Sequence, residues 1–102
     1  MPQADVTFPG AVGNLLSGRH GQVVFWTFDQ GGEVPPHAHG PQLGVVLTGG
    51  IRMSRGGTEV EYRAGQWFDL ADGETHAAHI RPGTLVIEVF EEADRHRERT
   101  AN

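Results

Sequence analysis

The amino-acid sequence predicts a single all-β domain that folds as a small barrel. The chain has 102 residues, which is enough for one domain but not for two. Its 15 glycines and 6 prolines are spread along the sequence, as expected for turns between short strands. Runs rich in β-branched and aromatic residues recur about every 8–12 residues, a spacing typical of sandwiches and barrels.

Two runs in the N-terminal half are expected to be extended. Residues 22–28 (QVVFWTF) follow a glycine-flanked turn and have the composition of a strand. Residues 31–39 (GGEVPPHAH) contain Pro35 and Pro36, which favour extended backbone at and before them. Because proline has no N–H to donate, the pair also argues against an interior sheet position before His37.

Two glycine pairs punctuate the middle of the chain. Residues 43–48 lead through Gly49-Gly50 into residues 51–55, and Gly56-Gly57 then leads into residues 58–63. Two glycines between strands predict a tight hairpin turn at both places. Further strands are expected at 67–70, 75–80 and 85–90, so the barrel occupies residues 1–90. Residues 91–102 form a charged tail, expected to be a solvated helical turn or a frayed end, and its His96 is given no role.

Composition and charge exclude several classes of function. The 8 Arg residues, with no Lys, face 13 Asp and Glu, and the formal net charge is −5, so neither nucleic acid nor an anionic membrane is expected as a partner. The absence of cysteine excludes disulfides and leaves nitrogen and oxygen ligands for any metal. The N-terminus lacks a basic stretch followed by an apolar run, so a cytoplasmic location is expected.

Three histidines and a glutamine have the placement of a metal site. His37 and His39 are separated by one residue, and alternate side chains of an extended strand point to the same face. Gly40-Pro41 then forces a turn, after which Gln42 opens the next strand with a carbonyl oxygen that can bind a metal. His76 begins another strand after a turn. We therefore expect one divalent ion at this cluster.

The same residues resemble the two sequence motifs of the cupins. The first motif is matched by Gly31, five residues, His37-Ala38-His39, two residues, Gln42, six residues and Gly49. The second is matched by Gly65, five residues, Ala71-Asp72-Gly73, two residues, His76, three residues and Ile80. The chain departs from the family in having Gln for the usual Glu, a spacer one residue short before it, Ala71 for Pro and Ile80 for Asn.

This resemblance, which covers residues 31 to 80, implies a fold and a ligand set. The fold is the single-domain cupin barrel, a double-stranded β-helix or jelly roll, and the implied ligands are His37, His39, Gln42 and His76. Gln occurs at this position in some small cupins, including cyclases and sugar-acid enzymes. Gln42 has an alternative role as a hydrogen-bond donor beside the ligands. If it binds the metal, four neutral ligands leave the ion with its full charge, which favours Lewis-acid chemistry on an anion.

Six further residues are candidates for catalysis or substrate binding. Glu88 lies within the apolar run LVIEVF, so it either faces solvent or enters the pocket as an acid or base. Glu74 and His79 flank His76 and are weaker candidates for the same role, with His79 expected on the opposite strand face. The candidate substrate contacts are Arg52, Tyr62 and Met53.

Three functions remain open from the sequence. The first is a non-oxidative metal-dependent enzyme, such as an isomerase, cyclase or lyase, acting on a small anionic or enolisable metabolite. The second is an iron-dependent dioxygenase, and the third is a non-catalytic module that binds or senses a small molecule. The ligand set suits Zn, Ni, Fe, Co or Mn alike. A homodimer through the N-terminal strand and the outer barrel face is also expected.

Overall fold

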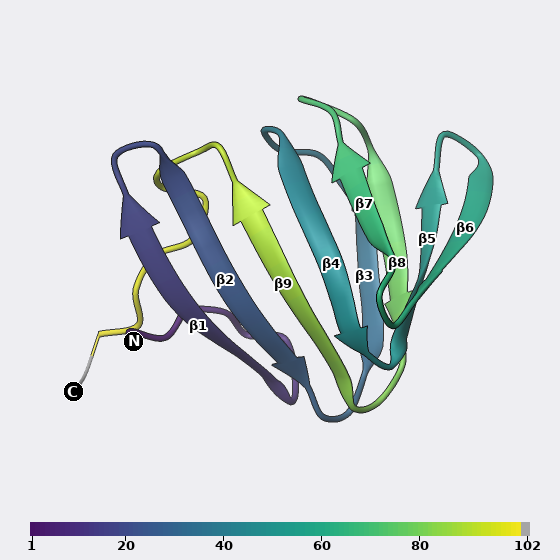
Figure 1. The fold of residues 1–102 in the computed structure, drawn as a ribbon, viewed down its shortest axis with the longest axis horizontal. Helices are drawn as coiled ribbons and strands as arrows, with labels where there is room; N and C mark the ends of the chain where they lie inside the picture. Colours follow the sequence, from purple (N-terminus) through teal and green to yellow (C-terminus); the bar gives the residue numbers. More distant parts are fainter. Residues whose placement is uncertain (101–102) are drawn as a thin grey trace.

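The computed structural model describes residues 1–100 and is built from nine β-strands (Figure 1). The strands are β1 (Ala11–Gly18), β2 (Gly21–Phe28), β3 (Gly32–His37), β4 (Gln42–Thr48), β5 (Gly50–Arg55), β6 (Thr58–Arg63), β7 (Trp67–Leu70), β8 (His76–Ile80) and β9 (Thr84–Phe90). Within these residues no helix is long and apolar enough to cross a membrane.

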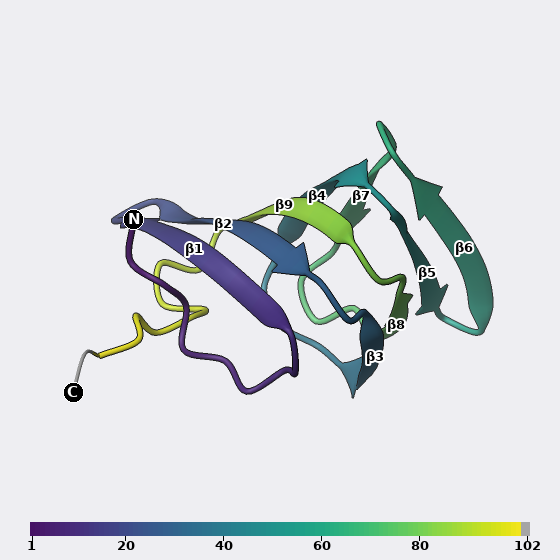
Figure 2. The same cartoon turned by 90° about the horizontal axis from the view of Figure 1, so that it is seen from below.

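Two antiparallel sheets face each other and enclose the core (Figures 1 and 2). The larger sheet has the order β1-β2-β9-β4-β7, and the smaller has the order β3-β8-β5-β6. Alternate residues of each strand point inward, which buries Val24 and Val86 from the larger sheet and Ile51 and Ile80 from the smaller. This is the all-β jelly roll that the sequence predicts.

The predicted strands all form, and apart from the segment 31–39 their ends differ from the predicted ends by one residue at most. The segment 31–39 is extended only as far as His37, and β3 is an edge strand that pairs with β8 alone. Its pairing register shifts between Val34 and His37, where Pro35 and Pro36 stand. The prolines therefore lie at an irregularity of the strand pairing, where the sheet does not need a backbone N–H donor. Strand β1 is not among the predicted strands, because its sequence AVGNLLSG lacks a run of β-branched residues.

The prediction of a hairpin at Gly49-Gly50 is wrong. Strands β4 and β5 belong to different sheets, so this pair carries the chain from one sheet to the other. Gly49 has a φ of 77°, and a Cβ there would lie 2.3 Å from Thr84 Oγ1, so the crossing requires glycine. The second pair does form the predicted two-residue hairpin, with Arg55 paired to Thr58.

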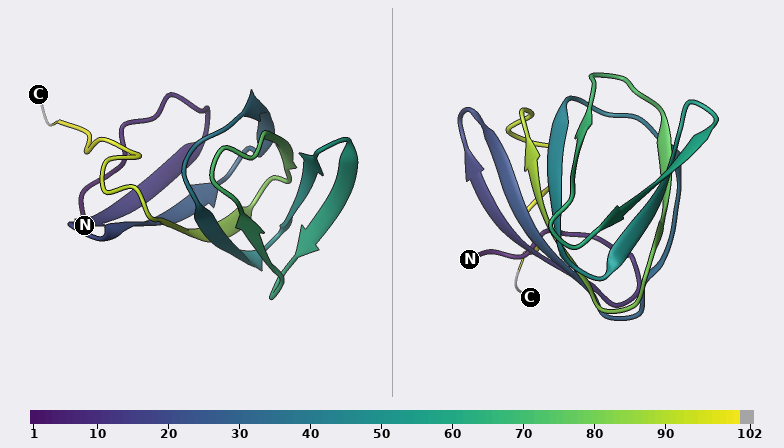
Figure 3. Two further views of the ribbon diagram at one scale, coloured as in Figure 1. Left: turned by 90° about the horizontal axis from the view of Figure 1, so that it is seen from above. Right: turned by 45° about the vertical axis from the view of Figure 1, so that its right-hand side comes forward.

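The C-terminal segment up to Thr100 is neither frayed nor helical, which corrects the expectation for it. It folds back with the N-terminal segment against the inner side of β1 and β2 (Figures 2 and 3). The buried side chain of Gln22 accepts a hydrogen bond from His96 N (2.8 Å) and donates one to His96 O (2.9 Å). Glu98 forms a β-bridge with Ala4. Residues 101 and 102 lie outside the described part of the chain.

Candidate metal centre

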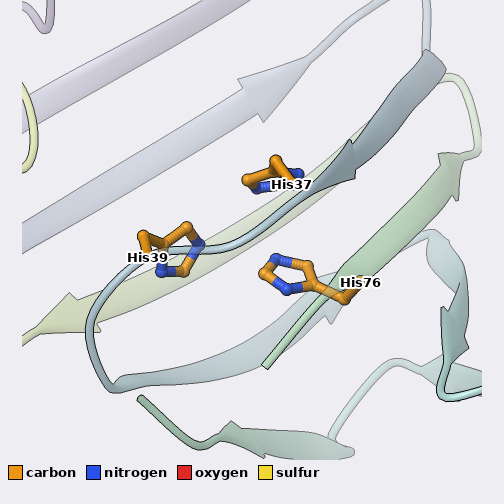
Figure 4. Close-up of side chains that lie close together, drawn as sticks. All are labelled: His37, His39 and His76. Atoms are coloured by element: carbon orange, nitrogen blue, oxygen red, sulfur yellow. The ribbon is translucent and has the colours of Figure 1, made fainter. Parts of the chain in front are cut away.

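His37, His39 and His76 converge at one end of the barrel (Figure 4). His37 ends β3 and is the cross-strand partner of His76, which begins β8, while His39 lies in the loop before β4. The ring centroids are separated by 4.2 Å (His37–His76), 4.9 Å (His39–His76) and 5.2 Å (His37–His39). One nitrogen of each ring lies within 4.8 Å of the others, close enough for a single ion to bind all three.

Hydrogen bonds to backbone carbonyls orient all three imidazole rings. The Nδ1 atoms of His37, His39 and His76 lie 2.9, 2.8 and 3.0 Å from the carbonyl oxygens of Pro35, Gly40 and Glu74. A carbonyl only accepts, so in the neutral form of each ring the proton is on Nδ1 and the lone pair is on Nε2. This arrangement is the usual support of metal-binding histidines, and it presents three Nε2 donors to one point.

Burial favours the neutral form of two of these rings. Desolvation lowers the pKa of both His39 and His76 below the usual value of 6.5, although the hydrogen bonds to Gly40 and Glu74 oppose the shift. The neutral imidazole is the form that binds a metal ion. The three imidazoles, their orientation and their neutral form therefore fit a divalent transition metal. Imidazole ligands alone do not determine which of the divalent transition metals binds.

Glu88 lies inside the barrel and not on its surface. Its carboxyl group accepts hydrogen bonds from Trp26 Nε1 at 2.6 Å and from the side-chain amide of Gln42. Burial raises the pKa of Glu88 to about 7, although both hydrogen bonds favour its ionised form. A carboxyl group that is half ionised near neutral pH can both take up and release a proton.

One cavity of about 230 Å³ brings these groups together between the sheets. It is lined by the three histidines, Gln42, Glu88 and a wall of mainly apolar side chains that includes Met53, Phe28, Phe68 and Phe90. The cavity opens at a mouth that is lined by His37, His39, Asp72, Glu91, Glu92, Asp94 and Arg95. Its volume suits a small metabolite.

The C-terminal segment supplies two cavity residues that sequence reasoning missed. Arg95 lines both the cavity and its mouth, with its guanidinium carbon 5.7 Å from the centre of the Phe90 ring. His96 packs edge-on against Trp26 and Phe90, at 5.3 Å from each ring centre, and burial lowers its pKa to about 4. No signal in the charged run EEADRHRER distinguishes these two residues from their solvated neighbours.

Two candidate acid–base residues stand apart from the cavity lining. Glu74 pairs with Arg55 Nε at 2.7 Å and accepts a hydrogen bond from Ala71 N at 3.0 Å. The Arg55 guanidinium lowers the pKa of Glu74 to about 2, which makes it a poor proton donor at neutral pH. His79 lies on the outward face of β8, as its spacing predicts, with Nδ1 2.5 Å from Glu33 Oε1.

Of the three candidate substrate contacts, only one lies at the cavity. Met53 lines the cavity. The Arg52 side chain is 56% exposed on the outer face, 3.8 Å from Glu59, and Arg52 is the cross-strand partner of His79. Tyr62 is buried, and its hydroxyl accepts a hydrogen bond from Arg55 Nη1 at 3.0 Å. Neither Arg52 nor Tyr62 lines the cavity, so a substrate within it would not touch them.

Comparison with solved structures gives close matches over almost the whole chain. KdgF from Halomonas sp. has a TM-score of 0.79 and 26% identity, covering 92% of this chain and 89% of that one. An RmlC-like cupin from Shewanella frigidimarina has a TM-score of 0.74 and 25% identity, covering 93% and 97%. A cupin superfamily protein from Desulfitobacterium hafniense has a TM-score of 0.74 and 12% identity, covering 85% and 82%.

No protein-family profile matches the sequence, and no curated protein matches it either. The fold is therefore assigned from structure, and the two glycine-framed motifs agree with it. The jelly roll, the histidine cluster at its open end and the structural neighbours agree: this chain has the fold of a small single-domain cupin and is similar to cupins of known structure.

Proposed function

We propose that this protein is a metal-dependent enzyme that acts without oxidation on a small metabolite with an acidic or enolisable centre. The observation that carries the proposal is Glu88. A titrating carboxyl group shares a small, mainly apolar cavity with three metal-oriented histidines. A module that only binds a ligand gains nothing from a buried carboxyl group whose pKa lies near neutrality.

The proposed chemistry is a proton transfer next to a carbonyl group. A divalent ion on the three Nε2 atoms would stabilise negative charge on a substrate oxygen. The Glu88 carboxylate would accept the proton of the neighbouring C–H bond, whose electron pair moves to the carbonyl oxygen and forms an enolate. Return of the same proton to another atom gives an isomer and restores Glu88. The step consumes no oxidant or reductant.

Arg95 is the proposed contact for a substrate anion, in place of Arg52. Its Nε is buried and has no hydrogen-bond partner among the described residues, which is costly for a guanidinium. A substrate carboxylate at the inner end of the mouth would satisfy it. The other ionisable groups at the mouth are four carboxylates and two histidines, so the local electric field favours entry of a metal cation. Arg95 is the group at the mouth that favours a substrate anion.

Proton exchange in D₂O tests the proposal. Metal-loaded protein is incubated with 2-oxo acids and sugar acids, and NMR follows deuterium incorporation beside the carbonyl group. We expect Glu88→Gln to keep its metal and to lose exchange by about 100-fold or more, as for loss of a general base. His79→Ala is the matched control and should exchange normally. Exchange that survives Glu88→Gln would remove Glu88 from the chemistry.

Metal analysis of protein purified without chelator separates the remaining functions. Zinc or nickel in stoichiometric amount agrees with the proposed chemistry, whereas stoichiometric iron favours a dioxygenase. A protein whose stability does not respond to any added divalent metal would favour the binding module, for which the apolar cavity wall is the supporting observation.

A further inference from the structure

The cavity between the sheets is polar at one end and apolar at the other. Alternate residues of each strand line it, so the strands give the order of its wall. Along β9 the lining residues run from Phe90, at the end that holds the histidines, through Glu88 to Val86. Along β8 they run from His76 to Ile80, which stand roughly 13 Å apart on an extended strand.

The wall beyond Glu88 consists of apolar side chains, and we call this part of the cavity the apolar end. Its members come from five strands and the N-terminal segment: Phe8, Phe28, Val34, Ile51, Ile80 and Val86. Trp26 also lines the cavity, but its single polar atom, Nε1, already donates to Glu88. Among the described residues, the apolar end therefore offers a ligand no free side-chain hydrogen-bond partner.

Phe8 covers the apolar end from the N-terminal segment. Its ring packs edge-on against Phe28, with the ring centres 5.6 Å apart. A Cβ on Gly32 would lie 2.9 Å from Phe8 Cζ, so the absence of a side chain on Gly32 lets the ring approach β3. The apolar end is thus walled by close packing of aromatic and aliphatic groups.

The positive charge of the cavity lies at the opposite end, with the histidines. Gln22, which holds the backbone of His96, is the cross-strand partner of Phe90. The Phe90 ring lies 5.5 Å from the His39 ring and 5.3 Å from the His96 ring, and the Arg95 guanidinium lies 5.7 Å from it. An anionic ligand therefore has one orientation, with its charged group near Arg95 and its remaining atoms directed past Glu88.

The volume of the cavity limits the size of those remaining atoms. Apolar protein cavities of about 150 Å³ stay dry and take up benzene. The cavity of this chain measures about 230 Å³. It therefore has room for a body of about six carbons, together with a head of two or three water-sized groups at about 30 Å³ each.

We propose that the ligand of this cavity is an amphipathic organic acid, with its carboxylate head at the histidines and an aromatic or branched hydrocarbon body in the apolar end. The inference rests on the proposed function and names its substrate class: a 2-oxo acid whose side chain is a hydrocarbon. The first CH₂ of that side chain would lie beside Glu88. A polyhydroxylated acid is disfavoured, because each hydroxyl buried without a partner lowers affinity by about 10–100-fold.

Two acids that differ by one hydroxyl test the ligand class by calorimetric titration of the zinc-loaded protein. Phenylpyruvate places a bare ring in the apolar end, and 4-hydroxyphenylpyruvate places a hydroxyl at the tip of the same ring. We expect the hydroxyl to raise Kd by about 10-fold or more. Gluconate, with a hydroxyl on every carbon beyond the carboxylate, should bind more weakly than either. Equal affinity for the two aromatic acids, or no binding of phenylpyruvate, would overturn the inference.

A variant at the apolar end gives a second measurement. Val34→Thr keeps the shape of the side chain and adds a hydroxyl to the wall, at a half-buried position on the edge strand β3. It should raise the Kd of phenylpyruvate by about 10-fold and leave the zinc content unchanged. Val12→Thr makes the same change on β1, at a side chain that is 41% exposed and outside the cavity, and should bind normally. Unchanged affinity in Val34→Thr would contradict contact between the ligand and this wall.

Deuterium exchange distinguishes failure of this inference from failure of the proposed function. Phenylpyruvate that binds tightly but exchanges only at its spontaneous rate would contradict the proposed proton transfer and still support the ligand class. Exchange that is catalysed equally well for phenylpyruvate and 4-hydroxyphenylpyruvate would support the proton transfer and overturn the ligand class. Selective binding and selective exchange of phenylpyruvate would support both.

Discussion

The side-chain amide of Gln42 donates a hydrogen bond to the carboxyl group of Glu88. The amide nitrogen is thereby committed to Glu88, so the carbonyl oxygen is the atom that Gln42 can offer to a metal. The contact also gives a reason for the departure from the cupin motif at this position. A glutamate in place of Gln42 would put two carboxylates in contact inside the barrel, which desolvation and repulsion both oppose.

Replacing Gln42 by glutamate should therefore raise the pKa of Glu88 further. The two carboxyl groups would share one proton near neutral pH, since like charges in contact cannot both ionise cheaply in a buried site. The measurement is the pH titration of the side-chain carboxyl carbons by NMR in metal-free protein. An apparent pKa that stays at about 7 or falls in Gln42→Glu would contradict the contact between these two residues.

Loss of His39 should abolish metal binding. Removal of groups that merely support metal ligands already weakens affinity by about 10–100-fold, and loss of one of three imidazole ligands should exceed that. Metal content after purification and calorimetric titration give the affinity of His39→Ala. His79→Ala removes an imidazole that points away from the cavity, and it should bind metal normally. Full occupancy in His39→Ala would show that the ligand assignment is wrong.

Glu88→Gln should change how the stability of the metal-free protein depends on pH. The folded-state pKa of Glu88, about 7, lies above its ordinary value of 4.5. Its protonated form therefore favours folding below about pH 4.5, and that contribution is lost as pH rises through 7. Above that pH the variant should gain up to about 3 kcal/mol relative to wild type. Denaturant unfolding across the pH range measures the difference, and a constant difference would contradict the buried position of the carboxyl group.

Loss of the Gln22 amide should release the C-terminal segment. Gln22→Leu removes both hydrogen bonds to His96 and leaves its backbone groups unpaired, a change that costs about 2–4 kcal/mol. Hydrogen exchange should then accelerate over residues 95–99, and a substrate anion should bind more weakly because Arg95 is no longer held at the mouth. Gln66→Leu, at an exposed glutamine, is the control. Unchanged exchange over residues 95–99 would show that other contacts hold the segment.

Much of the fold follows from local pattern in the sequence. Residues 22–28 and 58–63 become strands because β-branched and aromatic side chains fit a pleated surface, and the structure forms both. The metal cluster could also be predicted, because His37 and His39 are two residues apart and His76 begins a later strand. The strand parity assumed for His37 and His39 does not apply in full, since His39 lies beyond the end of β3. The loop geometry and the pairing of His37 with His76 complete the cluster.

By itself, then, the sequence determined the strands other than β1 and the three histidines, because both depend on patterns over a few residues. Tertiary structure alone decided the rest. A glycine pair has the same local signature in a hairpin and in a crossing between sheets, so only the sheet order could distinguish Gly49-Gly50 from Gly56-Gly57. Arg95 and His96 reach the cavity through hydrogen bonds to a buried Gln22, 74 residues away from His96 in the chain. A single hydrogen-bonded anchor produces no periodic pattern in a charged segment. The contribution of Arg95 and His96 to the cavity can therefore be recognised only in the tertiary structure.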